Sequence, residues 1–272
     1  MTQGTERGMA PMELGRLLNV LGGYGELAVA VSGGMDSLVL ARIAHRHHPC
    51  VEMFHAASPA VPRQASVRLE KLAADEGWKL SVIDVGELRS PGYVRNPADR
   101  CYYCKSRLYD GIRDHTRAVV ASGNNVSDLG DYRPGLRAAA ESGAVHPYIE
   151  AGIGKDGIRR LAGWFGWRDL SDLPASPCLA SRIETGIPIS EDALAVIDRV
   201  ETMIRDRFGC RVVRCRVRGG GISIELGAAF LDALTPERTA EIREALTALV
   251  DRLRDVQITA YRQGSAFLRD AK

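Results

Sequence analysis

The segment ELAVAVSGGMDS, residues 26–37, joins a short apolar run to a turn with two adjacent glycines. Its first part, Glu26 to Val31, is rich in alanine and valine and is bounded by Gly25 and Ser32, which is typical of a buried parallel strand. Leucine and isoleucine then recur at helical spacing between Asp36 and His47. A strand, a glycine turn and a helix in immediate succession predict the first half of a βαβ unit.

The same alternation extends from this segment in both directions. Apolar runs separated by amphipathic stretches indicate further strands and helices. We expect strands at 51–56, 79–85 and 118–122, and helices at 12–21, 62–76 and 100–116. This order predicts an α/β fold with a doubly wound, mostly parallel sheet, whose ligands bind at the carboxyl ends of the strands.

The pattern changes after the proline-rich stretch 170–188, which we interpret as a functional loop. Beyond it the sequence predicts a helix capped by Ser190, a hairpin, a second helix that begins at Thr235, and a last strand at 256–261. This αββαβ order indicates a small α+β domain. We therefore expect two domains, residues 1–187 with the glycine turn and residues 188–272 for substrate binding or oligomerisation.

The glycine turn has the chemistry of a phosphate-binding loop. Gly33 and Gly34 permit positive φ and let backbone N–H groups approach an anion, and the helix N-terminus adds its partial positive charge. Ser32 and Ser37 can donate to phosphate oxygens, and Asp36 suits a Mg²⁺ ion that bridges the phosphates. A structural glycine turn is the alternative.

The same loop lacks the lysine of a Walker A motif. This difference favours a loop that grips the β,γ-pyrophosphate of ATP as a leaving group. Attack then falls on the α-phosphate and gives an adenylate. The sequence therefore predicts an ATP-consuming enzyme that activates its substrate by adenylylation.

Composition narrows the class of protein. The chain has 272 residues and a formal net charge of +2, which gives no general reason to expect nucleic acid as a partner. Residues 1–21 contain no apolar run of signal-peptide length, and no stretch approaches the roughly 18 apolar residues of a membrane span. We therefore expect a soluble cytoplasmic protein whose six cysteines stay reduced.

Three of the cysteines form a second group of candidate functional residues. Cys101 and Cys104 make a C-x-x-C at the start of a predicted helix, and Cys178 lies in the proline-rich loop. The pair fits a redox site, half of a zinc site with His115 or His146 as a weak further ligand, or part of an iron–sulfur site. Three thiolates around a [4Fe–4S] cluster leave one iron open to bind a sulfide. We interpret the other cysteines as packing residues: Cys50, Cys210 and Cys215.

These motifs resemble known families at two levels. The loop resembles the SGG-x-D-S signature of the PP-loop ATP pyrophosphatase superfamily, which implies an adenine nucleotide alpha hydrolase-like fold and the products AMP and pyrophosphate. Nearly the whole chain is similar to the LarE family of ATP-dependent sulfur transferases. The matching pieces are SPAVP (58–62), NPADRCYYCK (96–105), GNNVSDLGDYRPGLRA (123–138), IEAGIGKDGIR (149–159), PCLASRI (177–183) and, more loosely, RCRVRG (214–219), Glu225 and YRQGS (261–265).

The second resemblance implies a reaction. Members adenylylate a carboxylate of pyridinium-3,5-biscarboxylic acid mononucleotide and replace its oxygen with sulfur, toward the nickel-pincer nucleotide cofactor. Some members sacrifice the sulfur of a cysteine that matches Cys178. Others carry a transferable sulfide on a [4Fe–4S] cluster held by cysteines that match Cys101, Cys104 and Cys178. Because all three are present, we expect the cluster type, a sulfide donor as partner and a homo-oligomer; the sacrificial type is the alternative.

Site residues follow by the same resemblance. Cys178 and Asp36 are the expected catalytic residues. The residues expected to bind ATP are Ser32, Gly33, Gly34, Asp36, Ser37, Ser58, Asn125 and Asp128, and those expected to contact the substrate phosphate are Ser181, Arg182, Arg214 and Arg216. Turn and cap chemistry is the alternative for Asn125 and Asp128, and a solvated strand face is the alternative for Arg214 and Arg216.

Two other functions use the same loop. A tRNA thiolase needs a basic groove or an added RNA-binding domain, and the near-neutral charge and 6% aromatic content count against it. An ATP-binding regulatory protein needs no turnover, and pyrophosphate release with a carboxylated nucleotide would exclude it.

Overall fold

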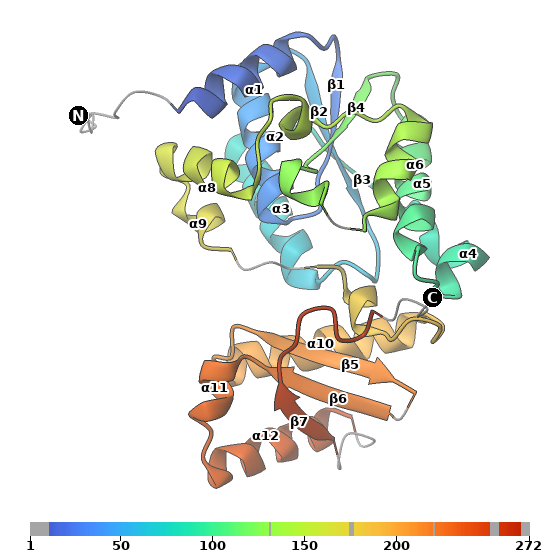
Figure 1. The fold of residues 1–272 in the computed structure, drawn as a ribbon, viewed down its shortest axis with the longest axis vertical. Helices are drawn as coiled ribbons and strands as arrows, with labels where there is room; N and C mark the ends of the chain where they lie inside the picture. Colours follow the sequence, from blue (N-terminus) through green and yellow to red (C-terminus); the bar gives the residue numbers. More distant parts are fainter. Residues whose placement is uncertain (1–10, 131, 174–176, 220, 251–255, 268–272) are drawn as a thin grey trace. The chain divides into compact units, whose positions relative to one another are not determined.

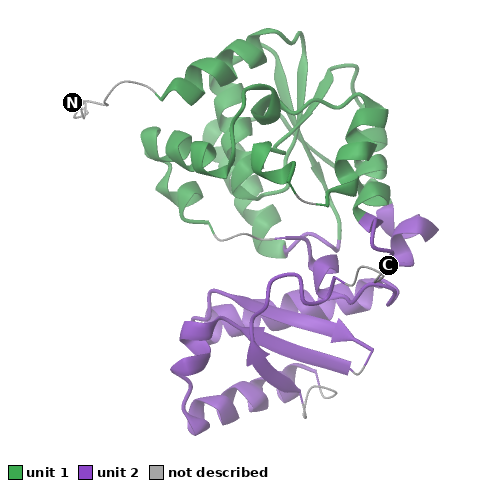
Figure 2. Ribbon diagram, viewed as in Figure 1, with its two compact units in different colours: residues 1–58, 63–86, 101–176 green, residues 59–62, 87–100, 177–272 purple. Residues whose placement is uncertain are grey.

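The structure is a computed structural model that describes residues 11–130, 132–173, 177–219, 221–250 and 256–267 (Figure 1). The chain divides into two compact units (Figure 2). Unit 1 comprises residues 1–58, 63–86 and 101–176, and unit 2 comprises residues 59–62, 87–100 and 177–272. Each unit is described by itself below. The expected domain boundary after residue 187 stays a prediction.

Unit 1 contains a four-stranded parallel sheet. Its strands are β1 (Leu27–Ala30), β2 (Val51–Ala56), β3 (Leu80–Ile83) and β4 (Val119–Ser122), in the order β3-β2-β1-β4. Leu27 of β1 pairs with Val51 on one side and with Val119 on the other. The strand order therefore reverses between β1 and β4, which is where a doubly wound sheet binds its ligands.

Helices cover both faces of this sheet. The helices expected from the sequence are α1 (Met12–Gly22), α2 (Met35–His47), α3 (Arg63–Glu76) and α5 (Arg100–Arg113). The structure adds α6 (Pro134–Ser142), α7 (Pro147–Glu150), α8 (Lys155–Trp164), α9 (Arg168–Ser171) and the 3-10 turn η2 (Val126–Asp128). The sequence did not predict α6 to α9, because two of them have only four residues and the other two begin at a proline or directly after a glycine.

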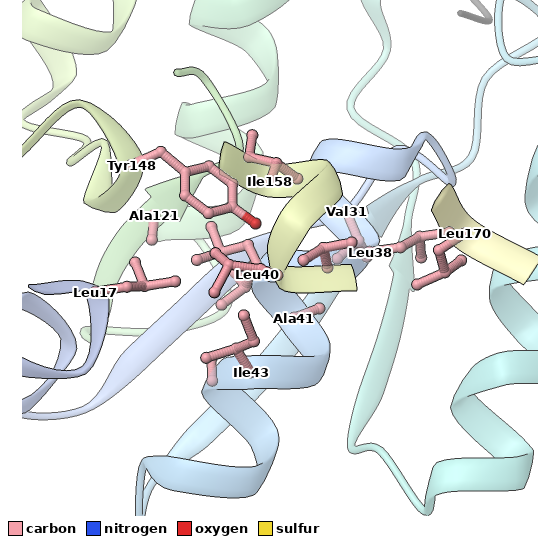
Figure 3. Close-up of a cluster of buried hydrophobic side chains, with 14 of the residues drawn as sticks. Leu17, Val31, Leu38, Leu40, Ala41, Ile43, Ala121, Tyr148, Ile158 and Leu170 are labelled. Atoms are coloured by element: carbon pink, nitrogen blue, oxygen red, sulfur yellow. The ribbon is translucent and has the colours of Figure 1, made fainter. Parts of the chain in front are cut away.

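The core of unit 1 lies in two layers, one on each face of the sheet. Leu27, Val29 and Val31 pack with α1, α2, α3 and α8, as the close-up in Figure 3 shows for part of this layer. Ala28 and Ala30 face the other way and pack with buried side chains of α5 and α6. Each buried leucine or isoleucine in these layers stabilises the fold by about 1.5–3 kcal/mol. The expected α/β fold with a doubly wound parallel sheet is confirmed.

Unit 2 has a three-stranded sheet in the order β5-β6-β7. β5 (Val213–Arg218) and β6 (Gly221–Leu226) are antiparallel, as the predicted hairpin requires, and β7 (Gln257–Ala260) pairs parallel to β6. Its helices are α4 (Pro91–Val94), α10 (Glu191–Phe208), α11 (Ala228–Asp232) and α12 (Pro236–Leu249), with 3-10 turns η1 (Glu87–Arg89) and η3 (Leu179–Arg182). The expected αββαβ tail is confirmed, with α11 in addition.

Side chains cap the two long helices of unit 2, α10 and α12, whose starts the sequence indicates. The side chain of Ser190 accepts a hydrogen bond from the N–H of Ala193 at 3.2 Å, and Thr235 does the same for Arg238 at 3.3 Å. Each such cap contributes about 1 kcal/mol. None of the helices in the described residues is long and apolar enough to cross a membrane.

Candidate active site

The glycine turn after β1 has a conformation that only glycine permits. Gly33 has a φ of +77°, and a Cβ atom at this position would overlap the backbone carbonyl of Ala65 on α3. Arg68 of α3 donates from Nη1 to the carbonyl oxygen of Gly33 at 2.9 Å. Gly34 has an ordinary φ of −87° and is the N-cap of α2. Of the two glycines, only Gly33 uses the left-handed region.

The two serines of the turn have different surroundings. Ser37 is buried; its Oγ donates to the carbonyl oxygen of Gly34 at 3.0 Å and accepts from the N–H of Ser32 at 3.1 Å. The Ser32 side chain is exposed and lies 3.3 Å from Ser37 Oγ. Ser37 thus closes the turn on itself, while Ser32 presents a hydroxyl at the surface of unit 1.

The end of β4 meets this turn. A Cβ atom on Gly123 would lie 2.9 Å from the backbone nitrogen of Ser37, so the two backbones are in close contact. Asn125, which is fully buried, donates from Nδ2 to Asp36 Oδ2 at 3.1 Å. Its own Oδ1 accepts from the N–H of Ser127 at 3.1 Å. The structure therefore brings together the predicted residues that follow β1 and β4.

Two carboxylates, the half-buried Asp36 and the buried Asp128, lie at this edge of the sheet. Burial, and then the negative charge of Asp128, raise the pKa of Asp36 above its usual value. Asp128 is 6% exposed and accepts from the N–H of Asn125 at 3.1 Å, which completes a capping box on η2. Asn125 and Asp128 therefore cap η2, and Asp128 also forms an acidic pair with Asp36. Carboxylate oxygens in this state suit a divalent cation, because the cation relieves their repulsion.

Cations that the sequence analysis did not assign surround the pair. Arg133 Nη2 lies 2.9 Å and Lys155 Nζ lies 3.7 Å from Asp128 Oδ1. The charges of Lys155, Arg159 and Arg133 also act to lower the pKa of Asp36. The turn 32–37 has no lysine of its own, and the positive charges near it therefore come from the starts of α6 and α8. The segment 149–159, which carries part of the family resemblance, is the sequence signal that could have identified two of these residues.

Tyr148 supports the turn from inside the core. Its ring is fully buried, and its hydroxyl donates to the backbone carbonyl oxygen of Asp36 at 3.1 Å. Figure 3 shows the ring among the apolar side chains beside α2. Burial raises the pKa of Tyr148 well above its usual value, so the hydroxyl stays a donor at neutral pH. The first turn of α2 is therefore fixed from its buried side.

The histidines that were considered as zinc ligands have other contacts. Nδ1 of His146 lies 2.9 Å from Oγ of Ser122 at the end of β4, and burial lowers the pKa of His146. Nδ1 of His115 lies 2.8 Å from the carbonyl oxygen of Gly111. Ser58, which was expected to bind ATP, is half-buried just beyond β2.

The expected cluster ligands are divided between the units. Cys101 is exposed and Cys104 is half-buried, and both lie on the first turn of α5, three residues apart and thus on one side of the helix. Cys178 is exposed and is the N-cap of η3 in unit 2. Within the described parts of the chain, no three His, Cys, Asp or Glu side chains form a group that could hold a metal ion.

The remaining cysteines differ from one another. Cys210 and Cys215 are buried as expected, and burial raises the pKa of the Cys210 thiol. Cys50 is exposed, so the expectation that it packs in the core is wrong. It stands in the turn before β2, where its N–H donates to His48 Nδ1 at 3.2 Å.

Arg182 organises the loop that carries Cys178. It is 1% exposed, and its guanidinium makes a two-pronged pair with Glu201, with Nε–Oε1 and Nη2–Oε2 distances of 2.9 Å. Nη1 donates to the carbonyl oxygens of Pro177 at 2.6 Å and Cys178 at 3.0 Å, and to Ser181 Oγ at 3.0 Å. The guanidinium of Arg182 therefore serves the protein itself and fixes the backbone of the Cys178 loop.

The arginines of β5 are also buried, so the alternative of a solvated strand face is wrong. Arg214 is 9% exposed and lies over the ring of Tyr261 at 5.3 Å. Burial, and then the charges of Arg182 and Arg216, lower its pKa. Arg216 is 3% exposed and donates from Nε to Glu225 Oε2 at 3.0 Å and from Nη1 to the carbonyl oxygen of Ser181 at 3.0 Å.

Glu201, Arg218 and Ser265 complete this set, and the sequence analysis did not single them out. Arg218 Nη2 and Ser265 Oγ both donate to Glu225 Oε1, at 2.8 and 2.6 Å. Burial acts to raise the pKa of Glu225, but the hydrogen bond from Ser265 and the charge and hydrogen bond of Arg216 hold it below its usual value. The period of two along β5 was the available signal for Arg218.

Comparison with known proteins adds relatives of similar length. No family model matches the chain. The uncharacterized protein slr1717 of Synechocystis sp. is 34% identical over 224 residues, which is 78% of this chain and 81% of the relative. The uncharacterized protein MJ0830 of Methanocaldococcus jannaschii is 27% identical over 185 residues, 66% of this chain and 70% of the relative. The pyridinium-3,5-bisthiocarboxylic acid mononucleotide synthase of Lactiplantibacillus plantarum is 29% identical over 209 residues, 75% of each chain.

Proposed function

This chain belongs to the same protein family as slr1717 of Synechocystis, and from that premise we propose that it is an ATP-dependent sulfur transferase. Its proposed substrate is pyridinium-3,5-biscarboxylic acid mononucleotide, and its product the corresponding thiocarboxylate. The printed name of the Lactiplantibacillus plantarum relative, a synthase of the bisthiocarboxylic acid mononucleotide, supports this reaction. The structural observation that carries the proposal is the turn 32–37, which meets the end of β4 beside the half-buried Asp36 and the buried Asp128.

The first step activates the substrate. A carboxylate oxygen of the substrate attacks the α-phosphorus of ATP, the bond to the bridging oxygen of the β-phosphate breaks, and pyrophosphate leaves. Backbone N–H groups at the start of α2 and the Ser32 hydroxyl are suited to hold the β- and γ-phosphates. Asp36 and Asp128 are the residues that would hold Mg²⁺, which neutralises charge on the leaving pyrophosphate. Lys155 and Arg133 balance the remaining negative charge.

The second step replaces oxygen with sulfur. A sulfur nucleophile attacks the carbonyl carbon of the acyl adenylate, the bond to the phosphate oxygen breaks, and AMP leaves. Cys101, Cys104 and Cys178 have the thiolate donors that a [4Fe–4S] cluster prefers, and the first two lie on one side of α5. When bound, such a cluster supplies a sulfide as the nucleophile. Arg182 holds the backbone of the third cysteine in place.

The exposure of Cys178 supports a second candidate for the sulfur source. In it the Cys178 thiolate attacks the acyl adenylate and forms a thioester as AMP leaves. Removal of the Cα proton then breaks the Cβ–S bond, which leaves dehydroalanine in the chain and the thiocarboxylate on the substrate. This alternative consumes one protein molecule for each sulfur and needs neither Cys101 nor Cys104.

The proposed anchor for the substrate phosphate is the arginine set of unit 2, which comprises Arg182, Arg214, Arg216 and Arg218. Ser181, Arg214 and Arg216 are the candidates for direct contact. The lowered pKa of Arg214 reflects a buried cation beside other cations, and an anion would relieve this state. We assign Arg182 to positioning the loop, because its donors already meet Glu201 and the carbonyl of Cys178.

The test is pyrophosphate release by anaerobically purified protein with ATP, Mg²⁺ and the carboxylated mononucleotide. We expect release that depends on the mononucleotide, and a product in which sulfur replaces oxygen by mass. Release without dependence on the mononucleotide would sink the proposal. About four irons per chain that are lost in Cys101→Ala indicate the cluster type. Loss of hydrogen sulfide mass from residue 178 after turnover indicates the sacrificial type.

A further inference from the structure

Arg100 is a buried arginine for which the function proposed above gives no role. It is the first residue of α5 and is 5% exposed. Its Nε and Nη1 atoms are buried and have no hydrogen-bond partner within the described part of the chain. Buried arginines normally have their donors satisfied, because desolvating a charged group is costly. A bound group with acceptor atoms would therefore satisfy these two donors of the guanidinium.

The surroundings of Arg100 within unit 2 supply an aromatic ring. The guanidinium carbon lies 5.8 Å from the centre of the Phe267 ring. A ring face attracts a cation, but the donors at the edge of the guanidinium plane still need acceptors. Across the described residues, no carboxylate lies within ion-pair distance of Arg100.

Phe267 closes a turn that other arginines also contact. Its N–H donates to the carbonyl oxygen of Gly264 at 2.9 Å. Arg218 Nη1 donates to the carbonyl oxygen of Ser265 at 3.1 Å, and Arg216 Nη2 donates to that of Arg262 at 3.3 Å. The turn 262–267 therefore has three arginines around it. The carboxylate beside them, Glu225, already accepts from Arg216 and Arg218, and among the residues that the structure describes no carboxylate pairs with Arg100.

We propose that Arg100 binds the phosphate group of the mononucleotide substrate. This inference rests on the proposed function and adds to its anchor a residue outside β5. A phosphate monoester offers several acceptor oxygens and a charge near −2, which matches a buried guanidinium with more than one unsatisfied donor. The two carboxylates of the substrate are the reacting groups, so the phosphate is the group that can stay bound at one position through both rounds of transfer.

The experiment measures binding without turnover, on the full chain with AMP and Mg²⁺ at saturation so that the turn 32–37 is occupied. The probes are inorganic phosphate, nicotinic acid mononucleotide and pyridine-3,5-dicarboxylate, followed by calorimetry and by thermal unfolding. We expect Arg100→Met to weaken nicotinic acid mononucleotide and phosphate about tenfold or more and to leave the dicarboxylate unchanged. Arg95→Met, which removes an exposed arginine of the same segment, is the matched control and should bind like the wild type.

A second readout separates binding from a structural role. Without ligand, Arg100→Met should unfold at the same temperature as the wild type or higher, because it removes a buried charge without a counterion. A lower unfolding temperature with unchanged affinity for both phosphate probes means that water satisfies Arg100, and it overturns the inference. So does a loss of affinity confined to the dicarboxylate. If Arg100→Met does not fold, Arg100→Lys, which keeps the charge, is measured in its place. Wild-type affinity for phosphate in Arg100→Lys also overturns the inference. Pyrophosphate release is assayed separately, so the proposed function and the role of Arg100 can each fail without the other.

Discussion

The turn 32–37 of unit 1 and the arginine set of unit 2 are built in opposite ways. The loop is made of backbone, with Gly33 in a left-handed conformation and Gly123 against the start of α2. The arginine set is made of long side chains whose positions depend on Glu201 and Glu225. In unit 1 the buried charge in excess is negative, and in unit 2 it is positive.

This difference indicates what each region lacks. Asp36 has a raised pKa because burial and Asp128 disfavour its charge, and Arg214 has a lowered pKa because burial and neighbouring arginines disfavour its charge. Both shifts disfavour the charged form of the side chain, and a bound ligand of opposite charge would oppose them. A cation for unit 1 and an anion for unit 2 are the complements that the proposed magnesium nucleotide and phosphorylated substrate would provide.

The largest expected effect is that of replacing Cys178, which separates sulfur transfer from adenylylation. Cys178→Ala should abolish thiocarboxylate formation, because both candidate sulfur routes pass through this cysteine, while pyrophosphate release continues in unit 1. Product mass and pyrophosphate are measured in the same reaction. Cys50→Ala removes another exposed cysteine and should leave both unchanged. Thiocarboxylate formation by Cys178→Ala at the wild-type rate would show that the sulfur comes from elsewhere.

The next effect tests the acidic side of the comparison. Asp36→Asn should lower pyrophosphate release about 100-fold or more, because the amide is a poor ligand for Mg²⁺. It should also leave the free energy of unfolding at pH 7 unchanged or raised. A carboxyl with a raised pKa binds its proton more tightly when folded, so wild-type stability falls as the pH rises from the unfolded pKa through the folded pKa. Chemical denaturation from pH 4 to 7 checks this, and a strongly destabilised Asp36→Asn would contradict it.

Substitutions of single and paired charges around Glu201 test the side-chain scaffold of unit 2. Arg182→Ala leaves Glu201 buried without its main partner and should cost about 3–5 kcal/mol of unfolding free energy. Arg205→Ala removes a longer, more exposed pair to the same glutamate and should cost roughly 1 kcal/mol or less. Replacing both members, Arg182→Met with Glu201→Leu, should recover part of the loss. Equal costs for the two single arginine variants would mean that burial of the pair has no energetic role.

The smallest effect concerns the pH dependence of Glu225. Its pKa is lowered by Ser265 and Arg216, so its contribution to stability is present above the unfolded pKa and is lost as the pH falls through the folded pKa. Glu225→Gln should therefore cost about 1–3 kcal/mol at pH 7 and much less in acid. Urea denaturation of both proteins across this range measures the difference. A cost that does not depend on pH would assign the effect to packing.

The sequence predicted the elements that have strong local signals. The run ELAVAV, the caps at Ser190 and Thr235 and the glycine-linked hairpin of β5 and β6 each depend on a few neighbouring residues. The helices α6 to α9 were missed because none exceeds ten residues and they depend mainly on tertiary packing, such as the burial of Tyr148. Propensity carries little information in segments of that length.

The site was predicted unevenly for a similar reason. Ser32, Asp36 and Asn125 follow strands that a parallel sheet must bring together, so their proximity could be inferred. Lys155 and Arg133 approach Asp128 from helices that the sequence did not indicate, and Glu201 meets Arg182 across a loop and a helix. Such pairs depend on three-dimensional packing, and a single sequence contains no periodic signal for them.

The contact between Gly33 and α3 has a consequence for ligand binding. The backbone of Gly33 packs so closely on Ala65 that the turn has little room to move, and Arg68 donates to its carbonyl oxygen. A turn fixed from behind before a nucleotide arrives loses little conformational entropy when the nucleotide binds, so more of the interaction energy becomes affinity. The rate of nucleotide association should then depend on diffusion and charge, with no slow rearrangement of residues 32–37.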